Sequence, residues 1–152
     1  MAIALSLHLL AAVVWVGGMF FAYVCLRPVA ASQLEPPLRL ALWNGVFARF
    51  FRWVWIAIVA LPITGYWMIF GHFGGMASVG WPVHAMQGIG WVMIALYLAL
   101  FLGPYQELNR AVNEERWPDG GKALNRIRQI VATNLVLGLV TVVLASGGRW
   151  MV

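Results

Sequence analysis

The chain has 152 residues, of which 62% are hydrophobic and only 10% are charged. Soluble domains carry about 25% charged residues, so this composition excludes a soluble globular protein and predicts an integral membrane protein. The net charge is +5, and all but one of the basic residues lie in or beside two connections. This distribution favours a signal for membrane topology over nucleic-acid binding. The single cysteine, Cys25, excludes an internal disulfide and any Cys-x-x-Cys site.

Four segments are long and apolar enough to cross a bilayer, which takes about 20 residues each. They are residues 2–26, 50–70, 82–103 and 128–147. The first is too long for the apolar core of a signal peptide and has no basic start. The sequence therefore predicts an all-α fold, a single-domain antiparallel four-helix membrane bundle.

The connections between these spans also carry predictions. After Glu35-Pro36-Pro37 ends the first helical region, residues 37–49 are amphipathic and are expected to form an interfacial helix. Span three is expected to continue as a soluble helix that turns at residues 118–121. The connection between spans two and three is short and rich in glycine.

Basic residues set the expected orientation. Of the ten lysines and arginines, all but Arg149 lie in or beside the first and third connections. The excess of positive charge on cytoplasmic loops places these two connections in the cytoplasm and both termini outside. The expected location is a bacterial inner membrane, with the lipid bilayer as the first partner and a homodimer as one possible assembly. Arg49 and Arg52 are interpreted as side chains that snorkel to the interface.

With this topology, all three histidines of the chain fall at the outer end of the bundle. His8 lies about 9 Å inside span one, at about 1.5 Å per residue. His72 closes span two, and His84 follows Pro82 in the first turn of span three. An ionisable residue inside a span is costly and indicates a functional site, whereas a solvated or packed histidine is the alternative interpretation, above all for His72.

Methionines lie near these histidines in the sequence. Met68 is one turn before His72, on a stripe with Ala57, Leu61 and Thr64, and Met86 follows His84 by two residues. Thioether and imidazole together suit Cu(I), although methionine is also an ordinary apolar filler. The predicted metal ligands are His8, His84, His72, Met68 and Met86.

Haem b is the alternative cofactor. Spans one and three run parallel and are expected to lie diagonally across the bundle, so His8 and His84 could be the two axial ligands. Gly88, one turn below His84, would leave room for a flat macrocycle, and Trp15 would shape the pocket. The outer side offers only Arg149 to the propionates. Gln87 and Asn134 are expected to hydrogen-bond inside the bundle.

Three stretches of the sequence form a recognisable set: LHLLAAVVWVGGMFF, Leu26-Arg27-Pro28 and FARFFRWVWIAIVALPITGYWMI. They contain a histidine and a Trp-x-Gly-Gly in span one, an Arg-Phe entry to span two and a Thr-Gly near its end, namely His8, Trp15, Gly17, Gly18, Arg49, Phe50, Thr64 and Gly65. In these features the sequence resembles the copper-resistance protein D (CopD) family. The resemblance is expected to be closest over residues 5–70. A weaker similarity links the chain to HemJ-type small haem membrane proteins, but their His-x-Lys pattern is replaced here by His84-Ala85-Met86.

Three functions remain open at this point. The resemblance implies copper handling at the outer face, with a periplasmic copper carrier or a membrane redox partner. The second is a haem b protein in electron transfer, and the third is a cofactor-free accessory subunit. An enzyme is not favoured, and a catalytic role would make the chain a haem-dependent oxidoreductase. No phosphate loop, Gly-x-Ser-x-Gly or His-Glu-x-x-His pattern is present.

Overall fold

The computed structural model describes residues 1–148 and contains four long helical segments, each apolar and long enough to cross a membrane. They are Ala2–Gln33, Pro36–Gly71, Trp81–Asn113 and Trp117–Gly147. The predicted four-helix architecture is therefore confirmed, and the chain is a multi-pass membrane protein. Arg149, the one cation expected on the outer side, lies outside the described residues.

The first segment combines three helical elements without a break. The α-helix α1, Ala2–Phe20, passes into a π-helix, η1, Phe21–Leu26, which passes into α2, Arg27–Gln33. Pro28 lies inside this continuous helical segment, directly after η1, where its missing N–H removes one hydrogen bond from the helix ladder. The π-helical turns are an addition that the sequence pattern did not predict, and they widen the helix just before Arg27.

The second segment is one helix, α3, Pro36–Gly71, which begins at two prolines in its first turn and contains Pro62. Residues 37–49 are thus the first part of α3, and the expected position of this stretch at the membrane interface stays a prediction. With 36 residues, α3 is about 54 Å long. This exceeds the hydrocarbon thickness of about 30 Å, so α3 extends well beyond it.

The second half of the chain forms α4, Trp81–Leu102, α5, Pro104–Asn113, and α6, Trp117–Gly147, after a short 3-10 turn, η2, Met76–Ser78. The chain reverses at residues 114–116, where Glu115 has a φ of 55°. The predicted turn at 118–121 is wrong, because Pro118 and Asp119 occupy the first turn of α6, where proline and acidic side chains are favoured.

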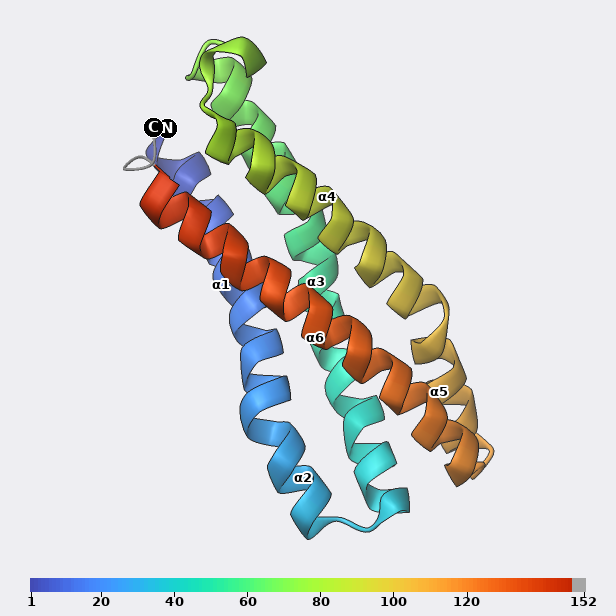
Figure 1. The fold of residues 1–152 in the computed structure, drawn as a ribbon. Helices are drawn as coiled ribbons and strands as arrows, with labels where there is room; N and C mark the ends of the chain where they lie inside the picture. The colour runs from blue at the N-terminus through green and yellow to red at the C-terminus, as the bar shows by residue number, and fades with distance from the viewer. Residues whose placement is uncertain (149–152) are drawn as a thin grey trace.

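The helices run antiparallel along their neighbours (Figure 1). The closest helix pairs are α1 with α3, and α6 with both α4 and α5. The N-terminus, the α3–α4 connection and the end of α6 lie at one end of the bundle, and the α2–α3 and α5–α6 connections lie at the other (Figure 1). His8, His72 and His84 therefore belong to the same end, as predicted.

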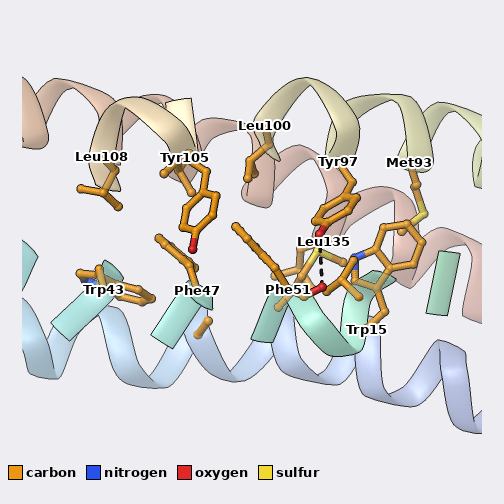
Figure 2. Close-up of a cluster of buried hydrophobic side chains, with 14 of the residues drawn as sticks. Trp15, Trp43, Phe47, Phe51, Met93, Tyr97, Leu100, Tyr105, Leu108 and Leu135 are labelled. Atoms are coloured by element: carbon orange, nitrogen blue, oxygen red, sulfur yellow. Dashed lines mark hydrogen bonds between the residues drawn. The ribbon is translucent and has the colours of Figure 1, made fainter. Parts of the chain in front are cut away.

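A column of aromatic side chains fills the bundle interior (Figure 2). On α3, Phe47 and Phe51 stack with ring centroids 5.2 Å apart, and Tyr97 of α4 donates a hydrogen bond of 3.3 Å to the Phe51 carbonyl. Trp15 of α1 packs edge-on against Tyr97 at 6.3 Å. Large aromatic rings meet well in such stacked and edge-on geometries. The outward-facing sides of the helices carry exposed Val, Ile and Leu side chains, which suit contact with lipid.

Candidate functional site

His8 is held against α3 by one hydrogen bond. Its Nδ1 atom lies 2.8 Å from Oγ1 of Thr64. The Thr64 hydroxyl itself donates to the carbonyl of Ala60 at 2.6 Å, so its only proton is already used. His8 Nδ1–H therefore donates to Thr64 Oγ1, and the Nε2 lone pair of this tautomer has no hydrogen-bond partner among the described residues. A histidine anchored in this way through one nitrogen is oriented to ligate a metal through the other.

Gly65 gives the His8 ring its space. A Cβ atom at position 65 would lie 3.3 Å from Cε1 and 3.8 Å from Nδ1 of His8. This is tighter than ordinary van der Waals contact, so a side chain at position 65 would press on the ring. Thr64 and Gly65 together form the seat of His8, one by a hydrogen bond and the other by the absence of a side chain.

Met68 stands one helical turn beyond Thr64 on the same face of α3. Ala57, Thr64 and Met68 are all buried, and Leu61 is half-buried, so the predicted stripe is confirmed as a packed face. Since α1 and α3 are antiparallel neighbours, this face continues past His8 toward the end of the bundle. A thioether and an imidazole are thus available on adjacent helices.

The other two histidines are exposed. His72 is the residue that ends α3, and its ring lies edge-on to that of Phe73 at 5.5 Å. His84 occupies the first turn of α4, two residues after the buried Pro82. Within residues 1–148 there is no group of three or more His, Cys, Asp or Glu side chains that could hold a metal.

The two remaining predicted site residues have different surroundings. Trp15 is buried, with 3% of its surface exposed, and packs on Tyr97. Gly88 is exposed and has open space where a side chain would stand, while Met86 is half-buried. The proposed part of Trp15 and Gly88 in a haem pocket stays a prediction.

Two polar side chains tie α4 to its neighbours, as predicted. Gln87 and Trp91 both donate to the hydroxyl oxygen of Tyr66 on α3, Trp91 at 3.2 Å. Asn134 of α6 is 3% exposed and donates to the carbonyl of Met93 at 3.1 Å. The carbonyl oxygen of the Asn134 side chain has no hydrogen-bond partner among the described residues.

The motif residues of spans one and two meet in pairs. His8 meets Thr64 and Gly65, and a methyl group on Gly18 would overlap the ring of Phe50. Gly17, by contrast, faces open space. The motif therefore describes how α1 packs on α3. Thr64 and Gly65 were part of the sequence motif, but their role as the seat of His8 was not predicted.

A cleft at the opposite end of the bundle was also missed. Its volume is about 350 Å³, and it opens between η1, α2, the start of α3 and the first half of α6. Three arginines line it, together with the aromatic side chains of Tyr23, Trp43, Phe47 and Trp117. The arginines are Arg27, Arg39 and Arg128. In the sequence these arginines stood out only as a topology signal.

Comparison with known families gives one match. The profile of the family CopD, copper resistance protein D, matches residues 44–147, from the first part of α3 to the end of α6. The match thus includes α4 and α6 and leaves α1 outside, whereas the resemblance was expected to be closest over residues 5–70. No curated protein and no solved structure matches the chain. Because the match covers well over half of its residues, the chain belongs to the copper resistance protein D family.

Proposed function

We propose that this protein binds copper as Cu(I) at the end of the bundle that carries the three histidines, with His8 and Met68 as the primary ligands. Membership of the copper resistance protein D family supports copper as the substrate. The observation that carries the choice of ligand is the pair of hydrogen bonds at Thr64, at 2.8 Å to His8 and 2.6 Å to Ala60. They orient Nε2 of His8, whose lone pair has no partner within residues 1–148, as the nitrogen that would bind the metal.

The ligand chemistry favours copper over the commoner divalent ions. Imidazole nitrogen and thioether sulfur suit Cu(I), and carboxylates, which Mg²⁺ and Ca²⁺ prefer, are absent from the seat of His8. His8 contacts the side chain of Thr64 and lies over Gly65, and Met68 is one helical turn further along α3. His84, Met86 and His72, which belong to the same end, would receive the ion or pass it on.

Orientation and partner belong to the same proposal. The basic connections point to a cytoplasmic location for the end opposite His8, so the copper end faces the periplasm of a bacterial inner membrane. A periplasmic copper carrier is then the partner that would load the site, and exposed His84 and His72 are the side chains it would meet first.

The experiment is a Cu(I) titration of detergent-purified protein against a colorimetric Cu(I) chelator. We expect one tight site, and we expect His8→Ala and Met68→Leu each to weaken it by at least about tenfold. Met19→Leu is the matched control, because Met19 is also buried, on α1, but belongs to the core cluster rather than to the seat of His8. Unchanged binding in His8→Ala would exclude the proposed site.

An optical spectrum of the same preparation, oxidised and then reduced with dithionite, tests the haem b alternative. A Soret band with sharp reduced α and β bands, lost in His8→Ala or His84→Ala, would replace copper by haem. If the protein neither binds copper nor shows a haem spectrum, the cofactor-free accessory subunit is the function that remains. Copper is favoured because the Thr64 anchor is seen at His8, while His84 has no comparable anchor among the described residues.

A further inference from the structure

The cleft at the far end of the bundle concentrates positive charge without a balancing negative charge. Arg27 and Arg39 are half-buried in its wall, and Arg128 is exposed at its side. Its lining contains no Asp or Glu. The three ion pairs found within residues 1–148 join Arg116 to Glu114, Arg116 to Asp119, and Arg126 to Glu107. The guanidinium groups of the cleft are therefore available to an external anion.

The cleft is not a metal site. No His, Met or Cys side chain lines it, so neither copper nor a haem iron would find a ligand there. Three arginines instead suit an oxyanion, because the planar guanidinium donates two parallel hydrogen bonds to phosphate oxygens. The first feature of the ligand is thus a phosphate or another oxyanion.

Most of the remaining cleft wall is apolar, which indicates a ligand with an apolar part as well as an anionic group. Beside the arginines and Asn125 it consists of aromatic and aliphatic side chains, including Trp43, Phe47 and Leu124. From Pro36 to Phe47 the lining runs about 16 Å along α3. A volume of about 350 Å³ is in the range of pockets for organic ligands, far larger than one phosphate. The second feature of the ligand is an apolar chain beside the anion.

The position of the cleft matches the level of lipid headgroups. Arg27 directly follows the first predicted span, residues 2–26, and Arg128 begins the last, residues 128–147. The cleft therefore opens where hydrocarbon gives way to the headgroup region. Basic pockets between membrane helices on the cytoplasmic side are typical sites for anionic lipids.

The π-helix η1 contributes directly to this cleft. Ala22 and Tyr23 of η1 line it, and the Arg27 guanidinium lies 5.0 Å from the centre of the Tyr23 ring. A cation–π contact of this kind holds the guanidinium in place while its N–H groups stay free. π-helical turns are rare and are found mostly at functional sites, so the position of η1 supports a binding site at this cleft.

We propose that the cleft lined by Arg27, Arg39 and Arg128 binds the phosphate headgroup of an anionic phospholipid, with the start of an acyl chain along its aromatic wall. This site is separate from the copper site and does not depend on it. Its positive charge is matched to a negative headgroup, and its apolar floor to a lipid tail. Binding would fix the junction of α2, α3 and α6 in the membrane.

Native mass spectrometry of the purified full chain tests the proposal. The protein in detergent is titrated with phosphatidylglycerol, with phosphatidylcholine of the same chain length, and with phosphatidylglycerol in the presence of inorganic phosphate. We expect at least about tenfold tighter binding of phosphatidylglycerol than of phosphatidylcholine, from the three cations. Equal affinity for both lipids would overturn the proposal. Displacement by millimolar phosphate would also overturn it in favour of a free-anion site.

Two triple variants locate the effect. Arg27→Gln with Arg39→Gln and Arg128→Gln is expected to lose the preference for phosphatidylglycerol. The matched control, Arg49→Gln with Arg52→Gln and Arg110→Gln, removes three exposed cations outside the cleft and is expected to keep it. Equal losses in both would mean that general surface charge is responsible and would contradict the proposal.

The single variant Arg128→Gln tests the site even if the triple variant fails to fold. Arg128 is exposed on α6, so its substitution leaves the packing of the bundle unchanged. We expect it to weaken phosphatidylglycerol binding several-fold, with an unchanged circular dichroism spectrum and an unchanged affinity for phosphatidylcholine. Full retention of phosphatidylglycerol binding in Arg128→Gln would count against the proposed site.

Discussion

The Oγ1 atom of Thr64 accepts a hydrogen bond from Nδ1 of His8 at 2.8 Å, although 56 residues separate them in sequence. The Thr64 hydroxyl is oriented by the helix that carries it, because it donates to Ala60 one turn back at 2.6 Å. A side chain of α3 thus determines which nitrogen of a ring on α1 is protonated. This relationship makes the tautomer of His8 a property of the α1–α3 packing.

Replacing Thr64 by valine tests this relationship. Thr64→Val keeps the shape of the side chain but removes the acceptor, so the ring is free to rotate and to change tautomer. We expect Cu(I) affinity to fall by about tenfold, the lower range for loss of a partner that orients a metal ligand. Chelator competition measures it. Thr64→Ser, which restores the hydroxyl, should bind nearly as tightly as the wild type, and equal losses in both variants would refute the role of the hydrogen bond.

A methyl group at Gly65 tests the space that the ring needs. It would lie 3.3 Å from Cε1 of His8, so Gly65→Ala should displace the ring and weaken Cu(I) binding several-fold. Gly45→Ala, on the same helix, places its methyl group 3.7 Å from the end of Arg49 and should leave copper binding unchanged. A Gly65→Ala variant with wild-type copper affinity would show that the ring tolerates the shift.

The contact between α1 and α6 depends on Gly138. A Cβ atom there would lie 2.8 Å from Cγ2 of Val16 and 3.3 Å from Cε of Met93. Val16 is short and stiff, so the helices would have to separate, and we expect Gly138→Ala to destabilise the fold by about 1–3 kcal/mol. Thermal unfolding in detergent measures this loss.

Gly121, on the same helix, is the control for that experiment. It faces open space, so Gly121→Ala should be neutral or stabilising by up to about 1 kcal/mol, the gain in helix propensity. The same loss of stability in both variants would mean that glycine at these positions serves backbone flexibility and not close packing.

The sequence was sufficient for the four helices and for the end at which the histidines gather. Long apolar runs leave a chain few alternatives in lipid, so the spans could be placed. One local prediction failed for an identifiable reason. Proline is tolerated in the first turn of a helix, so Pro118, taken as the start of a turn, stands inside the first turn of α6.

The site was predicted only in part, because its decisive contacts join distant segments. His8 stood out as an ionisable residue in a span, but the hydrogen bond to Thr64 depends on the register of α1 against α3, which no local pattern specifies. The π-helix η1 was missed because Phe21–Leu26 has the apolar composition of an ordinary span. The cleft was missed because Arg27, Arg39 and Arg128 come together only through the packing of three segments.

Asn134 supplies the last prediction, on the stability of the bundle interior. It is 3% exposed, its amide nitrogen donates to the Met93 carbonyl at 3.1 Å, and its Oδ1 has no partner within residues 1–148. The Met93 carbonyl already accepts a backbone hydrogen bond within α4, so Asn134→Leu leaves no buried polar group without a hydrogen bond. We expect this variant to change the free energy of unfolding by less than about 1 kcal/mol.

Asn134→Asp should behave very differently from Asn134→Leu. A carboxylate there would face the Met93 carbonyl oxygen without a donor, at the price of about 3 kcal/mol for a charge inside the membrane. Thermal unfolding in the same detergent compares the two variants. If Asn134→Leu proves as destabilising as Asn134→Asp, the hydrogen bond to Met93 contributes more than its geometry indicates, and the polar contact between α4 and α6 is a requirement of the fold.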